Sequence, residues 1–209
     1  MSTASQTAIS VDAPGKVNLY LAVGDVRPDG YHPLTTLFAA VSLTETVTVF
    51  EGQTPGLSLS MDIVPGSLVD QQMQAGQFDP AAVPMDERNL VYRAAELILA
   101  EHGIESAPAL HLHIAKAVPV AGGMAGGSAD AVAALIATDR YLHATGRTGA
   151  LLTQADYERL AAQLGADIPF SVRAALGKTF IIRLGQERTG AAGCVQVAVR
   201  SNKGGSRVR

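Results

Sequence analysis

The sequence has little of several features that define whole classes of protein. It has one cysteine, Cys194, and no tryptophan among its 209 residues, which excludes an internal disulfide framework and a cysteine-based metal cluster. Only 17% of the residues are charged and the formal net charge is -3, so no overall positive field attracts nucleic acid or anionic lipid. We therefore expect no nucleic-acid partner, and we expect any phosphate binding to be local.

Long apolar runs are also missing. No uninterrupted apolar stretch reaches the roughly 18 residues of a membrane helix, and residues 1–12 lack the basic and apolar regions of a signal peptide. Apolar residues still make up 47% of the chain, enough to fill a core. The composition predicts a globular, cytoplasmic protein with no membrane partner, and no pattern indicates an oligomeric state.

Two periodicities divide the chain into strands and helices. Alternation of apolar and polar residues predicts strands, and apolar residues spaced three and four apart predict helices. The expected strands cover 8–23, 44–50, 57–63 and 109–115, and the expected helices start at Asn89, after the glycine loop (to about His143) and at Thr153 (to Leu164). Residues 66–84 lack periodicity, which predicts a surface loop.

A glycine-rich loop lies between the strand at 109–115 and the helix that ends near His143. Gly122 to Ser128 contains four glycines within seven residues, and a helix N-terminus that follows such a loop offers unpaired N–H groups to an anion. The loop is not a Walker A sequence, because Ser128 stands where the lysine would be. A turn for tight helix–sheet packing is the alternative; Pro119 before the loop and Ser-Ala-Asp after it favour phosphate binding.

Three segments together resemble the GHMP kinase superfamily, in the form typical of its diphosphocytidyl-methylerythritol kinases. They are residues 119–130 (Pro-Val-Ala-Gly-Gly-Met-Ala-Gly-Gly-Ser-Ala-Asp), 13–19 (Ala-Pro-Gly-Lys-Val-Asn-Leu) and 27–32 (Arg-Pro-Asp-Gly-Tyr-His). The resemblance implies an α+β fold, the GHMP kinase N-terminal domain of ribosomal-protein type. We expect a mixed or mainly antiparallel sheet with helices packed on one side.

The resemblance implies a catalytic pair. Asp167, in Gly-Ala-Asp-Ile-Pro, would be the general base, and Lys16 would keep it ionised and oriented. Lys16 and Asn18 lie two apart on a strand and so face the same side, and Asn18 would help to hold the substrate. Without the resemblance, Lys16 would be a solvated charge and Asp167 a turn or capping residue at a helix-to-strand connection.

Nucleotide and substrate contacts follow from the same resemblance. Tyr31 would stack on the cytosine of the substrate and His32 would bond its edge, while Asn89 and Lys116 would line the adenine end of the ATP site. For Asn89 a helix-capping role competes. The ATP phosphates would contact the loop and its flanks: Pro119, Gly122, Gly123, Met124, Ala125, Gly126, Gly127 and Ser128.

The implied reaction is transfer of a phosphoryl group from ATP, with Mg²⁺, to the 2-hydroxyl of a small-molecule substrate, a polyol linked to cytidine diphosphate, in the non-mevalonate isoprenoid pathway. Whether Ser128 reaches the metal or a phosphate is open. No protein metal site is expected, and we interpret His111 and His113 as sheet residues because no third ligand follows. Two alternatives remain: another GHMP small-molecule kinase, or a catalytically silent nucleotide-binding module.

The resemblance extends over about residues 8–172. This predicts an N-terminal ATP-binding domain over 1–172 and a divergent, partly disordered tail over 173–209, which ends in a basic segment. The usual C-terminal lobe of the family has no counterpart in that tail. A natural short form and a change of reading frame after about Phe170 are both compatible with it.

Overall fold

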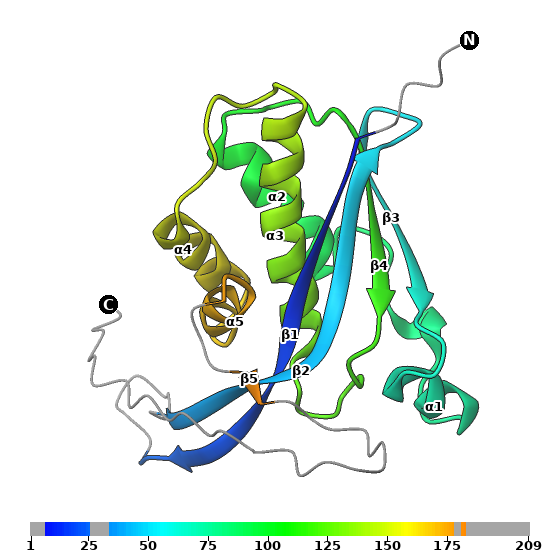
Figure 1. Ribbon diagram of the computed structural model, residues 1–209, viewed down its shortest axis with the longest axis vertical. Helices are drawn as coiled ribbons and strands as arrows, with labels where there is room; N and C mark the ends of the chain where they lie inside the picture. Colours follow the sequence, from blue (N-terminus) through cyan, green and yellow to red (C-terminus); the bar gives the residue numbers. More distant parts are fainter. Residues whose placement is uncertain (1–6, 26–33, 178–180, 183–209) are drawn as a thin grey trace, which may run out of the picture.

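Four long strands form one mixed sheet at the centre of the protein. In the computed structural model, which describes residues 7–25, 34–177 and 181–182, the strands are β1 (Ala8–Val23), β2 (Leu34–Glu51), β3 (Gly56–Ile63) and β4 (Ala109–Lys116). Their order is β1-β2-β4-β3; β1 and β4 are antiparallel to β2, and β3 is parallel to β4 (Figure 1). The predicted mixed sheet is confirmed.

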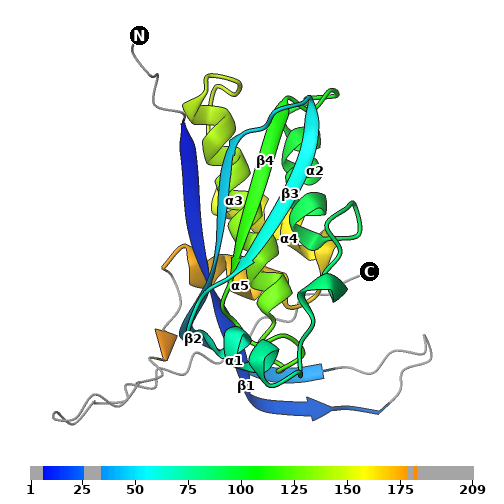
Figure 2. The ribbon, with the colours of Figure 1, turned by 90° about the vertical axis from the view of Figure 1, so that its right-hand side faces the viewer.

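Strand β2 begins ten residues before the predicted Thr44. Its first half is an apolar run with no alternation to signal a strand, including Phe38, Ala39, Ala40 and Val41. Strand β4 pairs only with residues 46–51 of β2. The first half of β2 pairs instead with β1 and, through Ala40 and Val41, with the short parallel strand β5 (Ile181–Ile182). The ends of β1 and β2 therefore extend beyond the rest of the sheet (Figure 2).

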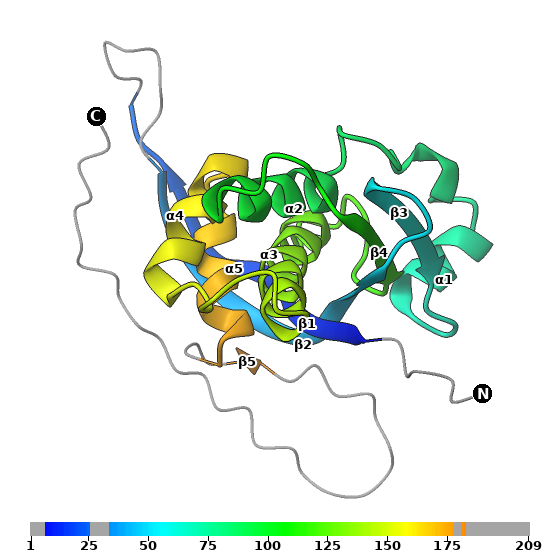
Figure 3. The ribbon, with the colours of Figure 1, turned by 90° about the horizontal axis from the view of Figure 1, so that it is seen from above.

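Helices α2 (Leu90–Glu101), α3 (Gly126–Ala144), α4 (Gln154–Leu164) and α5 (Ile168–Ala175) lie on one side of the sheet, as predicted (Figures 1 and 3). Helix α3 is central and packs on β1, β2 and α2. Alanines 129, 131, 133, 134 and 137 of α3 are fully buried, and their small size lets the helix approach its neighbours closely. The sheet side of the core is made by Val47, Val49, Leu110, Leu112 and Ile114.

The segment over 66–84, predicted as a surface loop, lies largely at the surface but is not irregular throughout. The segment contains α1 (Leu68–Gln74) and the 3₁₀ turn η1 (Pro80–Ala82). The side chain of Ser67 caps α1 by accepting a hydrogen bond from the N–H of Asp70. Only Val69 of α1 is buried, so this short helix has no apolar period that a sequence pattern could reveal.

The connection at Asp167 also differs from the expectation. It joins two helices, α4 and α5, rather than a helix and a strand, and Pro169 lies in the first turn of α5, where proline needs no donor partner. Helix α5 continues to Ala175, past the expected boundary at 172. The tail over 173–209 stays a prediction, because 178–180 and 183–209 lie outside the described residues. Within the described part of the chain, no helix is long and apolar enough to cross a membrane.

Candidate functional site

The glycine-rich loop between β4 and α3 has an unusual backbone. Ala121 and Ala125 have φ values of 59° and 54°, and Gly123 has 70°. Residues with a Cβ rarely occupy this left-handed region, and each costs about 1–2 kcal/mol there. Because two alanines accept that strain, the surrounding structure must fix the path of the loop, and strain of this kind gathers at ligand-binding sites.

The loop presents unpaired N–H groups at the start of α3. Ala125 is the N-cap residue, and its carbonyl accepts hydrogen bonds from the N–H groups of Ser128 and Ala129, each at 3.0 Å. Among the described residues, the N–H groups of residues 123–127 have no hydrogen-bond partner. The helix behind them is 19 residues long, and its dipole places partial positive charge at the same point. The arrangement suits an anion such as phosphate.

Lys16 and Asp167 form an ion pair beside this loop. Their Nζ and Oδ2 atoms are 3.3 Å apart; the Lys16 side chain is 8% exposed and that of Asp167 is 45% exposed. The Lys16 ammonium also donates to Asn18 Oδ1 at 2.6 Å and lies 4.9 Å from the ring centre of Phe38. The Asp167 carboxylate is thus accessible to a ligand. The Lys16 ammonium beside it is held in place by Asn18 and Phe38.

Side chains from β1, β2 and α5 form the floor around this pair. Asn18 donates from Nδ2 to Thr36 Oγ1 at 2.8 Å, so its amide is held between Lys16 and Thr36. The rings of Phe38 and Phe170 pack with their centres 5.0 Å apart. The shared face of Lys16 and Asn18, expected from their spacing, is confirmed.

The loop and the ion pair are joined through the backbone. The N–H of Lys16 donates to the carbonyl of Met124 at 2.9 Å. Gly15 permits this approach, since a Cβ there would lie 3.2 Å from the same carbonyl and 3.1 Å from Val118 Cγ1. An anion on the loop and a group on Asp167 would therefore be neighbours.

Comparison with known proteins agrees with this geometry. Residues 89–175 match the family described as GHMP kinases N terminal domain. The chain contains a GHMP kinase N-terminal domain. It is 48% identical over 165 residues to a 4-diphosphocytidyl-2-C-methyl-D-erythritol kinase of Mycobacterium avium, and 46% identical over 164 residues to that of Paenarthrobacter aurescens.

These matches cover 79% and 78% of this chain but 45% and 46% of the relatives, so the chain spans about half the length of the curated relatives it matches. A crystal structure of 4-(cytidine 5'-diphospho)-2C-methyl-D-erythritol kinase superposes with a TM-score of 0.54 at 33% identity, covering 81% of this chain and 49% of that one. A mevalonate kinase structure superposes with a TM-score of 0.54 at 16% identity, covering 80% of this chain and 51% of its own, and shows a shared fold.

Asn89 and Lys116 occupy defined structural positions in this GHMP kinase domain. Asn89 is the N-cap of α2: its Oδ1 accepts from the N–H of Val91 at 2.9 Å and its Nδ2 donates to the carbonyl of Pro84 at 2.6 Å. Lys116 is buried and donates from Nζ to Glu45 Oε1 and Asp130 Oδ2, both at 2.6 Å. The capping alternative for Asn89 is confirmed, and adenine contacts by either residue stay predictions.

Two carboxylates beneath the loop were given no role of their own by the sequence, although Asp130 ends the motif over 119–130. Glu45 and Asp130 are buried around Lys116. Burial and the nearby charge of Asp130 raise the pKa of Glu45 to about 7, against the attraction of Lys116. Burial raises the pKa of Asp130 more than Lys116 lowers it. A signal existed for Glu45, which shares the inward face of β2 with Val47 and Val49, where a charge is out of place.

The predicted cytidine-binding residues Tyr31 and His32 lie outside the described residues, and so does the Pro-Asp-Gly turn before them. Their roles stay predictions. His111 and His113 are sheet residues as expected: His111 bonds to Ser58 and Ser60, and Ser60 bonds to His113. The described part of the chain contains no cluster of three or more residues suited to a metal ion.

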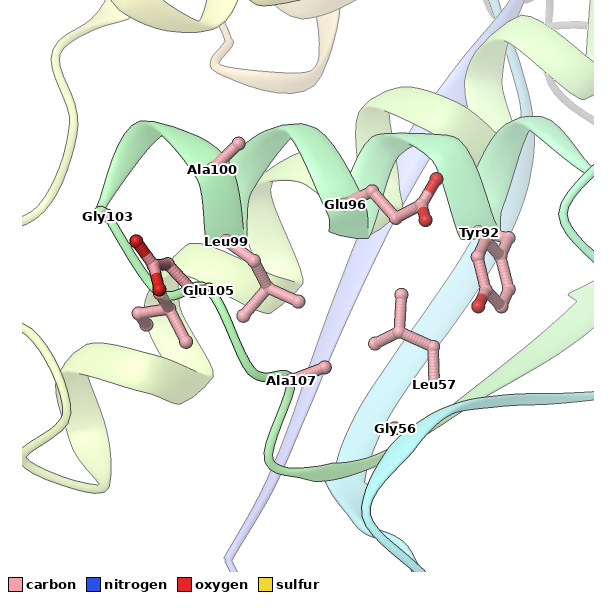
Figure 4. Close-up of a pocket in the computed structure, with 10 residues that line it drawn as sticks. Gly56, Leu57, Tyr92, Glu96, Leu99, Ala100, Gly103, Glu105 and Ala107 are labelled. Carbon is pink, nitrogen blue, oxygen red and sulfur yellow. The ribbon is translucent and has the colours of Figure 1, made fainter.

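A cavity of about 610 Å³ lies away from this site, between α2 and the start of β3 (Figure 4). None of the predicted site residues lines it. Its lining combines apolar side chains with the carboxylates of Glu96 and Glu105, so it lacks the converging donors that a phosphate needs. Its lining residues are Gly56, Leu57, Tyr92, Glu96, Leu99, Ala100, Gly103, Ile104, Glu105 and Ala107.

Proposed function

We propose that this chain binds ATP and transfers its terminal phosphoryl group to the 2-hydroxyl of 4-diphosphocytidyl-2-C-methyl-D-erythritol, a step of the non-mevalonate isoprenoid pathway. The observation that carries the proposal is the backbone bond from Lys16 to Met124, which sets the phosphate loop beside the Lys16–Asp167 pair. The similarity to 4-diphosphocytidyl-2-C-methyl-D-erythritol kinases over most of this chain supports the choice of substrate.

The loop fits the phosphates of ATP. Its unpaired N–H groups and the α3 dipole supply fixed positive charge without any lysine of the Walker type. Such preorganised donors are the main means by which proteins stabilise the charge of a transferring phosphoryl group. Pro119, Gly122, Gly123, Met124, Ala125, Gly126, Gly127 and Ser128 would form this cradle.

The residues near the loop suit a Mg²⁺ ion that is bound mainly by the phosphates of ATP. The nearby carboxylates of Glu45 and Asp130 are bonded to Lys116, whereas the hydroxyl of Ser128 has no hydrogen-bond partner among the described residues. Mg²⁺ commonly keeps several waters and binds through substrate phosphates with few protein groups. When bound, it would supply charge neutralisation, with the Ser128 hydroxyl as the available protein oxygen.

Asp167 would accept the proton of the substrate hydroxyl. Its carboxylate is nearly half exposed at the mouth of the site and lies 3.3 Å from the Lys16 ammonium. Lys16, held by Asn18 and Phe38, would keep that carboxylate oriented toward the hydroxyl so that the oxygen attacks in line.

A silent nucleotide-binding module is the second candidate, because the chain spans only 45–46% of the relatives' length. One experiment separates the two. The purified chain is assayed for ATP-dependent phosphorylation of 4-diphosphocytidyl-2-C-methyl-D-erythritol, with Asp167→Asn as the matched variant and ATP binding measured for both.

We expect the parent chain to turn over and the variant to be slower by about 10²–10⁴-fold, the usual contribution of a general base, with unchanged ATP affinity. Binding of ATP without turnover by the parent would favour the silent module. Turnover by Asp167→Asn at the parent rate would remove Asp167 from the role of base.

A further inference from the structure

A buried charged triad lies directly beneath the phosphate loop. It consists of Glu45 from β2, Lys116 at the end of β4 and Asp130 in α3, and these residues are exposed by 0%, 4% and 6%. The Lys116 ammonium donates to both carboxylates at 2.6 Å. Lys116 and Asp130 flank the loop, and Glu45 comes from a distant part of the sequence, so the triad joins three elements of the fold.

The triad connects the two ends of the loop. Glu45 accepts hydrogen bonds from the N–H groups of Ala117 (2.8 Å) and Val118 (3.3 Å), where the chain leaves β4. Lys116 bonds in turn to Asp130, one turn into α3, where the chain has left the loop. One continuous set of hydrogen bonds therefore runs from the entry of the loop to its exit.

The exit of the loop also rests against the triad. A Cβ at Gly126 would stand 2.9 Å from Glu45 Oε1 and 3.2 Å from Lys116 Nζ. Gly126 is the first residue of α3, so its N–H is among the unpaired donors of the loop. A shift of either charged side chain would move the backbone that carries these donors.

Stability alone does not account for this triad. It contains two carboxylates for one ammonium, and Asp130 Oδ1 is buried without a hydrogen-bond partner among the described residues. Buried ion networks are often no more stable than apolar residues of the same volume. A network that is costly and incompletely paired is better explained by the geometry that it imposes.

We propose that Glu45 and Asp130, acting through Lys116, are positioning residues that hold the entry and exit of the phosphate loop at a fixed separation, and so set its affinity for a chain of phosphates. This proposal rests on the proposed function for the identity of the nucleotide. It assigns none of the three side chains to direct contact with the phosphates.

The test is calorimetric titration of the full 209-residue chain with ATP and, separately, with inorganic triphosphate, in the parent and in Glu45→Gln and Asp130→Asn. Both variants keep the side-chain shape and replace a carboxyl group by a neutral amide, and titration at pH 8 keeps Glu45, whose pKa is about 7, largely ionised in the parent. Asp139→Asn is the matched control: Asp139 is also fully buried and accepts from His102, Leu152 and Tyr157, but it lies outside the loop. Circular dichroism verifies that each variant is folded at the temperature of titration.

We expect Glu45→Gln and Asp130→Asn to bind both ligands at least about tenfold more weakly, as when one charge-assisted hydrogen bond to a phosphate is lost. We expect Asp139→Asn to bind both ligands like the parent. Parent-like affinity in the two triad variants would overturn the proposal, as would an equal loss in Asp139→Asn. If the parent bound triphosphate but not ATP, the kinase function would be rejected. The positioning role of the triad would then be judged from the triphosphate affinities of the variants alone. Binding of neither would reject both.

Discussion

The Cα of Gly126 lies against the carboxylate of Glu45, so closely that a Cβ at this position would stand 2.9 Å from Oε1. The next glycine differs: a Cβ at Gly127 would meet only Leu90 Cδ1, at 3.8 Å. Packing therefore requires glycine at position 126 but leaves room for a side chain at position 127.

This contrast gives a prediction for two alanine substitutions. Gly126→Ala should destabilise the chain by about 1–3 kcal/mol, the usual cost of overpacking, and weaken ATP binding. Gly127→Ala should be neutral or slightly stabilising, because alanine is the better helix former. Urea unfolding and ATP titration of both variants check this, and equal behaviour of the two would contradict it.

Lys16 allows a test of the ion pair without loss of packing. In Lys16→Met the apolar stem still covers Phe38, but the charge beside Asp167 is gone. We expect kcat to fall by about 10²-fold or more, as when one charge-stabilising group is removed from a site, with little change in stability because Asp167 is half exposed. Steady-state kinetics and thermal unfolding measure the two effects. A kcat near that of the parent would show that Lys16 has no part in catalysis.

Asn89 can be tested for its capping role separately from nucleotide contact. Asn89→Ala removes the acceptor for the N–H of Val91 and should cost about 1 kcal/mol. Asn89→Ser keeps a capping acceptor, and since both variants lose the hydrogen bond from Nδ2 to the carbonyl of Pro84, it should be more stable than Asn89→Ala by about 1 kcal/mol. If Asn89→Ser keeps this stability but binds ATP more weakly than the parent, the adenine-side role gains support. Equal stability of the two variants would exclude the cap as a contribution.

Regular periodicity explains which elements could be predicted. The strand over Ala8–Val23 has an alternating pattern, and the helices at Leu90 and Gln154 have helical apolar periods and clear N-caps, so their predicted bounds agree with the structure within a residue or two. The first half of β2 and the short helix α1 lack such periods, since one is an apolar run and the other buries a single side chain. Their conformations are determined by tertiary contacts.

The site also contains residues that the sequence predicts and residues that it does not. Lys16, Asp167 and the glycine loop could be recognised because their motifs are short and continuous. The triad could not, because its members come from β2, β4 and α3, and only the fold brings Glu45 within 2.6 Å of Lys116. Lys116 was expected at the adenine, yet its ammonium donates hydrogen bonds to the carboxylates of Glu45 and Asp130. Pairings that depend on tertiary structure leave no local pattern.

The raised pKa of Glu45 predicts how stability depends on pH. Because the pKa is about 7 in the folded chain against an ordinary 4.5, the native state binds a proton more tightly than the unfolded state does. The contribution of Glu45 is therefore fully present below about pH 4.5 and is lost as the pH rises through 7. It amounts to about 3 kcal/mol at most, at 1.36 kcal/mol for each pKa unit. The raised pKa of Asp130 acts in the same direction.

Glu45→Gln isolates this contribution, because glutamine cannot ionise and resembles the protonated acid. His111, whose pKa is lowered by burial and by His113, acts in the opposite direction in parent and variant alike, so the difference between the two chains removes it. We expect urea unfolding between pH 4.5 and 7.5 to show the parent losing stability relative to Glu45→Gln as the pH rises. Parallel curves for the two chains would mean that Glu45 is ionised throughout this range, and that Lys116 then outweighs both burial and the repulsion of Asp130.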